Sequence, residues 1–340
     1  MATFGRTGPD AAMRGIEEFW RWWPHAAEEF AQAVDGDYGS LPQQLADRVA
    51  AIDPDLHWEL GQGVDARHAL CLSAGGDATL RPLTERWLRA APPADDVWEY
   101  LPARRADPAA LDLRLQFNSQ EFDLAETRLS IQIDEPAMRV AVTVHHPLFA
   151  QASAQLRQQI SYLVLDWLLG EDDVERWLGE ISTTAARLPD ALPADALVET
   201  VRAMAQRHVE PSWTLLTARA PDGTLTLSTT MRPLCWIDHP LLDQHIAVSL
   251  SYPIDPHSGL PTDEALVDLR CREDELTSLL GPRALLVAHE TARGRRVLHL
   301  YSDSTDPSAT ATTERWADQC PGAAVETHAD PAWKSVRHLS

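Results

Sequence analysis

Basic residues are scarce in this chain, and Lys334 is the only lysine. The 340 residues contain 29 Lys and Arg against 51 Asp and Glu, which gives a formal net charge of −22. A protein that binds nucleic acid through the phosphate backbone needs a basic surface, and an anionic lipid surface attracts the same charge. The composition therefore argues against nucleic acid and membranes as partners. A basic protein is the partner that the charge favours.

Cysteine is also rare, and no two of the four cysteines are close in sequence. The chain therefore has no Cys-x-x-Cys pair and no spacing typical of a zinc site. The first twenty residues contain no apolar signal-peptide segment, and no apolar run approaches the length of a membrane-spanning helix. We expect a reduced, cytoplasmic protein without a metal or another cofactor.

The motifs of common enzyme families are missing as well. The sequence has no GxSxG elbow, no HExxH pair and neither of the glycine-rich phosphate motifs. Gly75 and Gly76 follow a predicted strand and precede a predicted helix, where backbone N–H groups can hold a phosphate, but no lysine follows them. A plain turn is the favoured interpretation. These absences favour a non-catalytic protein and leave the question of catalysis open.

The best linker candidate is residues 183–196, which are small and include Pro189 and Pro193. This segment divides the chain into a predicted N-terminal domain, 1–182, and a predicted C-terminal domain, 197–340. The acidic charge is uneven, because residues 1–195 carry −16 and residues 196–340 carry −6. If charge selects the partner, the N-terminal part is where it acts.

Apolar periodicity predicts an α+β protein in which each domain is an antiparallel sheet with packed helices. An apolar stripe predicts a helix over Ile16–Val34, with Pro24 inside it either as a kink or as the start of a second helix. Asp77 is the expected N-cap of a following helix. Gly170 is expected to end one helix and to cap another, whose apolar pattern continues to Ile181. N-terminal strands are predicted at 56–60, 69–73, 97–101, 111–117, 128–133 and 138–146.

The C-terminal domain has a clear order of predicted elements, β-β-β-α-β-β-α-β, after a short helix that carries Leu197 and Met204. Asp222-Gly223 and Arg293-Gly294 are expected to form hairpin turns. Thr262 is the expected N-cap of a helix over 263–280. Strands are predicted at 213–218, 224–230, 245–252, 284–291, 296–301 and near 325, with a last helix around 312–319. This order fits an antiparallel sheet with helices on one face.

Four short motifs in the C-terminal part carry a resemblance. They are Trp213 in the first strand, Gly259-Leu260-Pro261 at a helix entry, Glu273-Asp274-x-Leu276 in that helix, and Asp330-Pro331-x-Trp333 near the end. From about Trp213 to Trp333 the chain resembles the bacterial domain-of-unknown-function 695 family, which is similar to the regulator B of ribonuclease E. The resemblance implies a ferredoxin-like α+β domain that serves as a protein-binding or regulatory module.

The N-terminal part resembles a second domain that is often joined to that family and has no known function. The motifs that carry this likeness are Phe19-Trp20-x-Trp22-Trp23, Asp53-Pro54-x-Leu56-x-Trp58-Glu59 and Leu169-Gly170-Glu171.

Glu273 is the sharpest candidate for a functional side chain. Its position, four residues after Leu269 and three before Leu276, places it within the apolar face of the predicted helix. A buried carboxylate is costly unless it is paired or hydrogen-bonded. Glu273 is therefore either a salt-bridge partner or a pocket carboxylate, and an arginine partner would argue against the pocket. The candidate binding residues are Glu273, Asp274, Trp213 and Trp333.

The histidines are not expected to form a metal site. His145 and His146 are adjacent in a strand and point to opposite faces. The hairpin register places His289 opposite residue 298 and therefore on the other face from His299. Residues 238–245 contain two aspartates and two histidines, but a solvated loop is favoured because the spacing fits no known metal motif. The arginines at 293, 295 and 296 are interpreted as a solvated hairpin tip.

Three functions are compatible with these observations. The favoured one is a non-catalytic regulatory or protein-interaction module that binds through its acidic N-terminal half or through the sheet of its C-terminal domain. The second is a small-molecule-binding protein or hydrolase with Glu273 in a pocket. The third is an acidic immunity-type protein that neutralises a basic toxin or nuclease.

Overall fold

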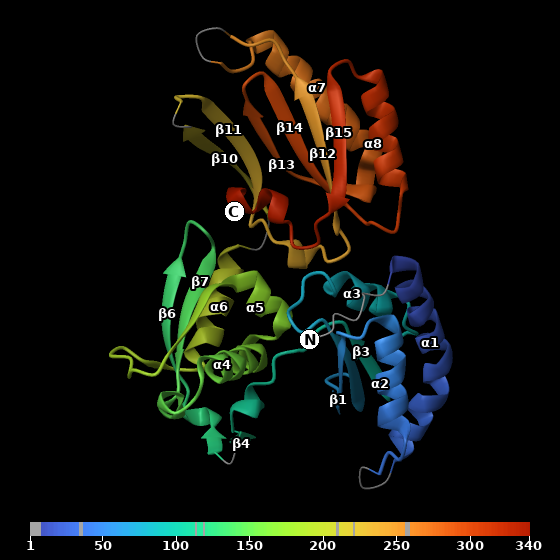
Figure 1. Cartoon of the computed structure of the whole chain (residues 1–340), viewed down its shortest axis with the longest axis vertical. Helices are drawn as coiled ribbons and strands as arrows, with labels where there is room; N and C mark the ends of the chain where they lie inside the picture. The colour runs from blue at the N-terminus through green and yellow to red at the C-terminus, as the bar shows by residue number, and fades with distance from the viewer. Residues whose placement is uncertain are drawn as a thin grey trace. The chain divides into compact units, whose positions relative to one another are not determined.

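The computed structural model describes residues 8–33, 37–112, 114–117, 120–208, 211–219, 222–255 and 259–340 (Figure 1). The chain is a mixed α and β protein with several sheets and packed helices. It folds as two compact units, Met1–Val209 and Glu210–Ser340. Within the described residues, no helix combines the length and the apolar character that a membrane crossing requires.

The first unit begins with two helices beside a three-stranded sheet (Figure 1). The sheet has the order β1-β2-β3. α1 runs unbroken through Pro24, and its apolar stripe is buried as predicted, although Val34 lies outside the described residues. The elements are α1 (Pro9–Gln32), α2 (Leu41–Ile52), β1 (His57–Gln62), β2 (His68–Ser73), α3 (Arg81–Arg89) and β3 (Trp98–Leu101).

Aromatic side chains dominate this core. Trp23 stacks on Phe19 and meets Trp98 edge to face at 5.0 Å between ring centroids. Trp23 and Trp87 are fully buried. Gly15 lets α1 approach α2 closely, because a Cβ there would lie 2.8 Å from the carbonyl oxygen of Ala51. The tryptophan-rich stripe of α1 is therefore core, as the helical spacing predicts.

The rest of the first unit is a four-stranded sheet with the order β8-β7-β6-β9, covered by helices, together with a short β4-β5 hairpin. Fully buried side chains of β6, β7 and α4, among them Leu129, Val142 and Val164, form its core. The elements are η1 (Pro108–Asp112), β4 (Arg114–Phe117), β5 (Gln120–Asp123), η2 (Leu124–Glu126), β6 (Arg128–Asp134), β7 (Arg139–His145), η3 (Pro147–Ala150), α4 (Ala154–Leu169), α5 (Glu171–Trp177), β8 (Leu178–Thr184), β9 (Leu192–Pro193) and α6 (Ala196–Arg207).

Several N-terminal expectations were wrong in detail. β3 pairs with β2 in parallel, and β8 pairs with β7 in parallel, so these sheets are not purely antiparallel. Both pairs are joined through helices, and a parallel pair needs such a crossover connection. Gly170 does separate α4 from α5, but the second helix ends at Trp177 and the apolar pattern continues as β8. The strand predicted at 111–117 is shorter and covers only 114–117, because 108–112 form a 3-10 turn.

Asp77 does not cap α3. The helix begins at Arg81, and the Asp77 carboxylate instead accepts hydrogen bonds from the backbone and hydroxyl of Thr79. A preceding turn, closed by the N–H groups of Leu80 and Arg81 on the Asp77 carbonyl, delays the helix start.

The division between the units lies at residues 209 and 210 rather than within the expected linker at 183–196. β8 ends inside that segment, and β9 pairs with β6. α6 then buries Leu197, Val201 and Met204 in the core of the first unit. The small, proline-containing segment is therefore a connection inside the first unit, because its sequence cannot reveal where the helix after it packs.

The second unit is a six-stranded sheet with the order β10-β11-β13-β14-β12-β15, in which every described pair is antiparallel. Thr262 caps α7 through its side chain, as predicted. The elements are β10 (Ser212–Arg219), β11 (Leu225–Arg232), η4 (Trp236–Asp238), β12 (Gln244–Ser251), α7 (Asp263–Leu280), η5 (Gly281–Arg283), β13 (Ala284–Ala292), β14 (Arg295–Ser302), α8 (Ser308–Gln319), β15 (Ala323–Ala329) and η6 (Lys334–Leu339).

Two apolar clusters stabilise this sheet. One joins β12 and β14 to α7 and α8, with Val248, Leu276 and Leu298 fully buried. The other joins Val287 and Tyr301 to the segment between β11 and β12 and to the C-terminal turn η6. Each cluster covers the central strands, and neither includes an exposed side chain of β10.

Candidate functional site

Glu273 lies where the helix spacing predicts, on α7 and against the sheet. Its carboxylate is 3.1 Å from Nδ1 of His289 on β13 and 3.5 Å from Nη1 of Arg296 on β14. The Glu273 side chain is only 17% exposed and the Arg296 side chain only 5%. Burial lowers the pKa of Arg296, while the Glu273 charge raises it. The salt-bridge alternative thus describes Glu273, and the arginine partner argues against a pocket role.

The strand register connects His289, which lies beside Glu273, with residues of β11 and β10. His289 lies opposite Leu298 on one side and Thr229 of β11 on the other, and Thr229 lies opposite Leu215 of β10. Directly paired residues of antiparallel strands share a face of the sheet. Leu215 therefore lies on the same face as α7.

β10 forms one end of the sheet and pairs only with β11 among the described strands. Along this edge Trp213 is 53% exposed and Leu215 is 64% exposed. An unpaired strand edge carries free N–H and C=O groups, and native proteins usually shorten, charge or cover such an edge. β10 is eight residues long and its only charged residue is Arg219 at its end, so it is neither short nor charged along its length.

α7 lies beside this face of the sheet. α8 packs against β15, and α7 packs against β13. Glu275 of α7 accepts a hydrogen bond from Trp316 of α8, so the opposite flank of the helix faces β11 and β10. Val267 and Asp274 are exposed, but helical spacing places both on the side of α7 that is turned away from the buried Leu269 and Leu276. We call the exposed side chains of Trp213 and Leu215 the β10 surface.

The four predicted binding residues do not form one site. Trp213 is exposed on β10, Asp274 is exposed on the solvent side of α7, and Glu273 lies between α7 and the sheet. Trp333 is elsewhere and is only 3% exposed. Its ring stacks on Tyr301 with centroids 4.6 Å apart, and its Nε1 donates to the carbonyl of Leu242. Trp333 therefore serves the core beneath the C-terminal turn.

The residues of the closing motif are structural as well. Asp330 accepts hydrogen bonds from the hydroxyl of Tyr301 and from the backbone N–H groups of Lys334 and Ser335. These bonds hold the pKa of Asp330 below its usual range despite burial, and burial together with the Asp330 carboxylate raises the pKa of Tyr301.

The N-terminal motif around Gly170 also has a structural explanation. Gly170 has a φ of 82°, and a Cβ there would lie 3.0 Å from the backbone of Arg104 and Ala106. Glu171, the next residue, accepts hydrogen bonds from the hydroxyl of Ser73 and from the backbone and guanidinium of Arg104. The motif joins β2 to α5 through the carboxylate of Glu171, whose two oxygens both accept hydrogen bonds.

A histidine and carboxylate chain on the other face of the C-terminal sheet was missed by sequence reasoning. Oε1 of Glu290 lies 3.2 Å from Nε2 of His299 and 3.0 Å from Nε2 of His338. Nδ1 of His299 is then 3.0 Å from Nε2 of His245. Nδ1 of His245 is buried and has no hydrogen-bond partner among the described residues. If each histidine donates towards Glu290, this last nitrogen is an unprotonated acceptor.

The pKa values of this chain follow from those contacts. Hydrogen bonds from His299, and the charge of His338, lower the pKa of Glu290 to about 2 against the opposing effect of burial. Burial, with the two neighbouring histidines, lowers the pKa of His245 to about 4. No described nucleophile is hydrogen-bonded to His245. The chain therefore fixes His338 to the sheet and gives no support for catalysis.

The predictions about the other histidines can be compared with the structure directly. His145 bonds to Thr184 and His146 to Asp123, and the register places His289 opposite Leu298 as expected. Among the described residues, no group of three or more histidine, cysteine or acidic side chains could hold a metal ion.

The loop at 238–245 is less solvated than expected, because Asp243 is buried and accepts hydrogen bonds from Ser304, and His245 is in β12. At the hairpin tip, Arg293 and Arg295 are exposed as predicted, and Arg293 pairs with the exposed Asp222. Arg296 departs from the prediction, because it is buried against Glu273.

Comparisons of the chain with protein-family models, curated proteins and solved structures found no match. The likeness to the domain-of-unknown-function 695 family therefore stays an expectation from the four motifs. Function has to be argued from the geometry of the chain itself.

Proposed function

We propose that this chain is a non-catalytic protein-interaction module that takes up an extended, basic segment of a partner protein along β10. The observation that carries the proposal is the edge of β10 that no described strand pairs with, together with the exposed side chains of Trp213 and Leu215. An added strand would form main-chain hydrogen bonds with the edge, and alternate side chains of that strand would contact Trp213 and Leu215.

The charge of the chain selects between two occupants of this edge. A second copy of the chain would bring together two units that each carry −7 over residues 210–340. A basic segment would instead be attracted by this charge. Tryptophan and arginine dominate binding energy in most protein interfaces, so a basic segment next to Trp213 is well suited to this surface.

The order of elements supports the regulatory part of the proposal. Helices α7 and α8 connect β12, β13, β14 and β15 in the order β-α-β-β-α-β, which is the order of a ferredoxin-like domain. This supports the ferredoxin-like expectation and the likeness to a small regulatory module. Fold alone does not establish a function, so the proposal rests on the edge and its side chains.

The other two functions have less support. A ligand site built on Glu273 would need a free carboxylate, whereas Glu273 is shared between His289 and Arg296. Neutralisation of a basic toxin or nuclease agrees with the acidic charge, and would be one biological use of the same β10 surface.

A direct test measures the binding of a labelled peptide that alternates lysine and valine, by fluorescence anisotropy at low and high salt. We expect saturable, salt-sensitive binding, and at least tenfold weaker binding when Trp213→Ser and Leu215→Ser are combined. The matched control is Leu279→Ser, because Leu279 is also half-exposed in the same unit.

Equal binding by all three proteins would mean that the peptide meets only the general negative charge, and would overturn the proposal. So would a concentration-dependent dimer that the double variant abolishes, because a second copy would then be the occupant. A peptide that alternates glutamate and valine should not bind.

A further inference from the structure

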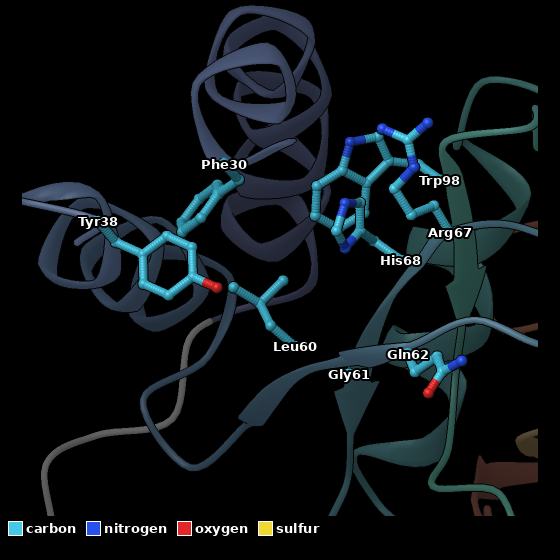
Figure 2. Close-up of a pocket in the computed structure, with 8 residues that line it drawn as sticks. All are labelled: Phe30, Tyr38, Leu60, Gly61, Gln62, Arg67, His68 and Trp98. Carbon is cyan, nitrogen blue, oxygen red and sulfur yellow. The ribbon is translucent and has the colours of Figure 1, made fainter. Parts of the chain in front are cut away.

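The first unit contains a pocket of about 250 Å³ that the β10 surface does not involve. It lies where the end of α1, the turn before α2 and the three strands β1, β2 and β3 meet. Figure 2 shows Phe30, Tyr38 and Leu60 on one side of it and Trp98, His68 and Arg67 on the other. Gly61 and Gln62 of β1 complete the lining.

Three aromatic rings line this pocket, and two of them are fixed. Phe30 is 4% exposed and Trp98 is 5% exposed, and Trp98 donates its Nε1 hydrogen to the carbonyl of Ala27 on α1. Tyr38 is 39% exposed and lies against Phe30, with ring centroids 5.5 Å apart. The aromatic lining is therefore formed in advance, and only Tyr38 presents much of its ring to solvent.

The polar side of the pocket is basic, and two of its side chains have no partner for a charge or a ring nitrogen among the described residues. Arg67 is exposed and makes no ion pair with any described residue. The ring of His68 lies 5.0 Å from that of Trp98, and its Nε2 has no hydrogen-bond partner among the described residues. Arg67 and His68 are consecutive at the start of β2, where backbone bonds to Asp96 and Val97 hold both residues.

We propose that this pocket binds a small planar aromatic carboxylate, with the ring between Tyr38 and Trp98 and the carboxylate paired to Arg67. Aromatic faces favour a flat, apolar ring, and a guanidinium forms paired hydrogen bonds with a carboxylate. Few polar groups and several aromatic walls are typical of small-molecule sites. The site is independent of the proposed partner-binding edge, because all of its residues lie in the first unit.

The volume limits the size of the ligand. An engineered apolar cavity of roughly 150 Å³ can hold benzene, whereas pockets for drug-sized ligands begin at roughly 300 Å³. A pocket of about 250 Å³ therefore suits one substituted ring or a compact pair of fused rings.

The sign of the ligand charge follows from the lining. Three aromatic rings alone would also suit a quaternary ammonium ion. No carboxylate lines the pocket among the described residues, however, and Arg67 would repel a cation. A carboxylate is therefore the favoured charged group, even though the chain as a whole carries −22.

The test is isothermal titration of the full-length protein with benzoate, benzamide and tetramethylammonium. We expect saturable binding of benzoate, with benzamide about tenfold weaker because it lacks the charge that pairs with Arg67. Arg67→Gln should weaken benzoate about tenfold and leave benzamide unchanged. Its control is Arg14→Gln, an exposed arginine on α1 of the same unit.

A second pair of variants tests the aromatic wall. Tyr38→Leu should weaken benzoate and benzamide alike, whereas Tyr162→Leu, at a similarly exposed tyrosine on α4, should change neither. The proposal would be overturned by the absence of saturable benzoate binding, by binding that neither Arg67→Gln nor Tyr38→Leu alters, or by binding of tetramethylammonium in place of benzoate.

Discussion

Buried charged and polar side chains in the second unit have specific partners, and those partners decide what each residue can do. Glu273 is held by Arg296 and His289, and Asp330 by the turn that follows it. Neither carboxylate is left free to bind a ligand. At this scale, the residues that remain available are Trp213 and Leu215, which have apolar side chains exposed to solvent.

Glu273→Leu should destabilise the second unit by roughly 3 kcal/mol, because it leaves the buried guanidinium of Arg296 without its carboxylate. Combining it with Arg296→Met should recover most of this loss, since a buried ion pair can often be replaced by apolar side chains. Urea denaturation of the three proteins measures both changes. If Glu273→Leu is neutral or stabilising, the ion pair is not what holds Glu273 in place.

Acidification should destabilise the second unit through His245. Its pKa is about 4 in the folded chain and 6.5 in a model compound, so the unfolded chain binds the proton first as pH falls. Stability is therefore full above pH 6.5 and is lost as pH falls to about 4, by up to roughly 3 kcal/mol. Glu290 also makes the unit less stable as pH falls, because its pKa is lowered from 4.5 to about 2 in the folded chain, and this loss occurs over that lower pH range.

His245→Gln removes the titrating ring and should flatten the upper part of this pH profile. Denaturant unfolding followed from pH 7 to pH 4 measures the difference, with His25→Gln, an exposed histidine on α1, as the control. A profile that is unchanged in His245→Gln would show that other groups carry the acid sensitivity.

At the scale of elements, predictions succeeded where the signals are local. The bounds of α7, its Thr262 cap and the register of the β13-β14 hairpin depend on residues close in sequence. β8 was missed because an apolar run after a short helix can continue as helix or as strand, and its pairing with β7 is non-local. The His245 chain was missed because β12 lies between β14 and β15.

The candidate site was only partly predictable for the same reason. The helix pattern placed Glu273 against the sheet, but its Arg296 and His289 partners come from strands that a helix pattern cannot locate. Trp213 was proposed from a resemblance. Its exposure depends on β10 being the end strand, which only the complete sheet order reveals.

The position of α6 gives a test at this scale. Leu197 is fully buried in the core of the first unit, so Leu197→Ala should destabilise that unit by about 2–5 kcal/mol. Hydrogen exchange in the full-length protein should show faster opening of β6 and β7 and unchanged protection of β12 and β14. The reverse pattern would mean that α6 belongs with the second unit and that residues 183–196 are the linker.

At the scale of the whole molecule, the proposed partner class comes from composition and the proposed binding place from the structure. The charge of −22 favours a basic partner, and sequence reasoning assigned that partner chiefly to the N-terminal half. The unpaired strand edge with exposed apolar side chains is in the other unit. Charge acts over the whole surface and can speed association, whereas a strand edge specifies where binding occurs.

Site-specific photo-crosslinking tests this claim most directly. A photoreactive phenylalanine analogue is placed at residue 215 in one protein and at residue 279 in another, and each is irradiated in a lysate of its source cells. The account predicts a crosslink from residue 215 alone, to an extended and basic stretch of a single partner that mass spectrometry identifies. Equal crosslinking from both positions, no crosslink from residue 215, or a crosslink to another copy of the chain would contradict it.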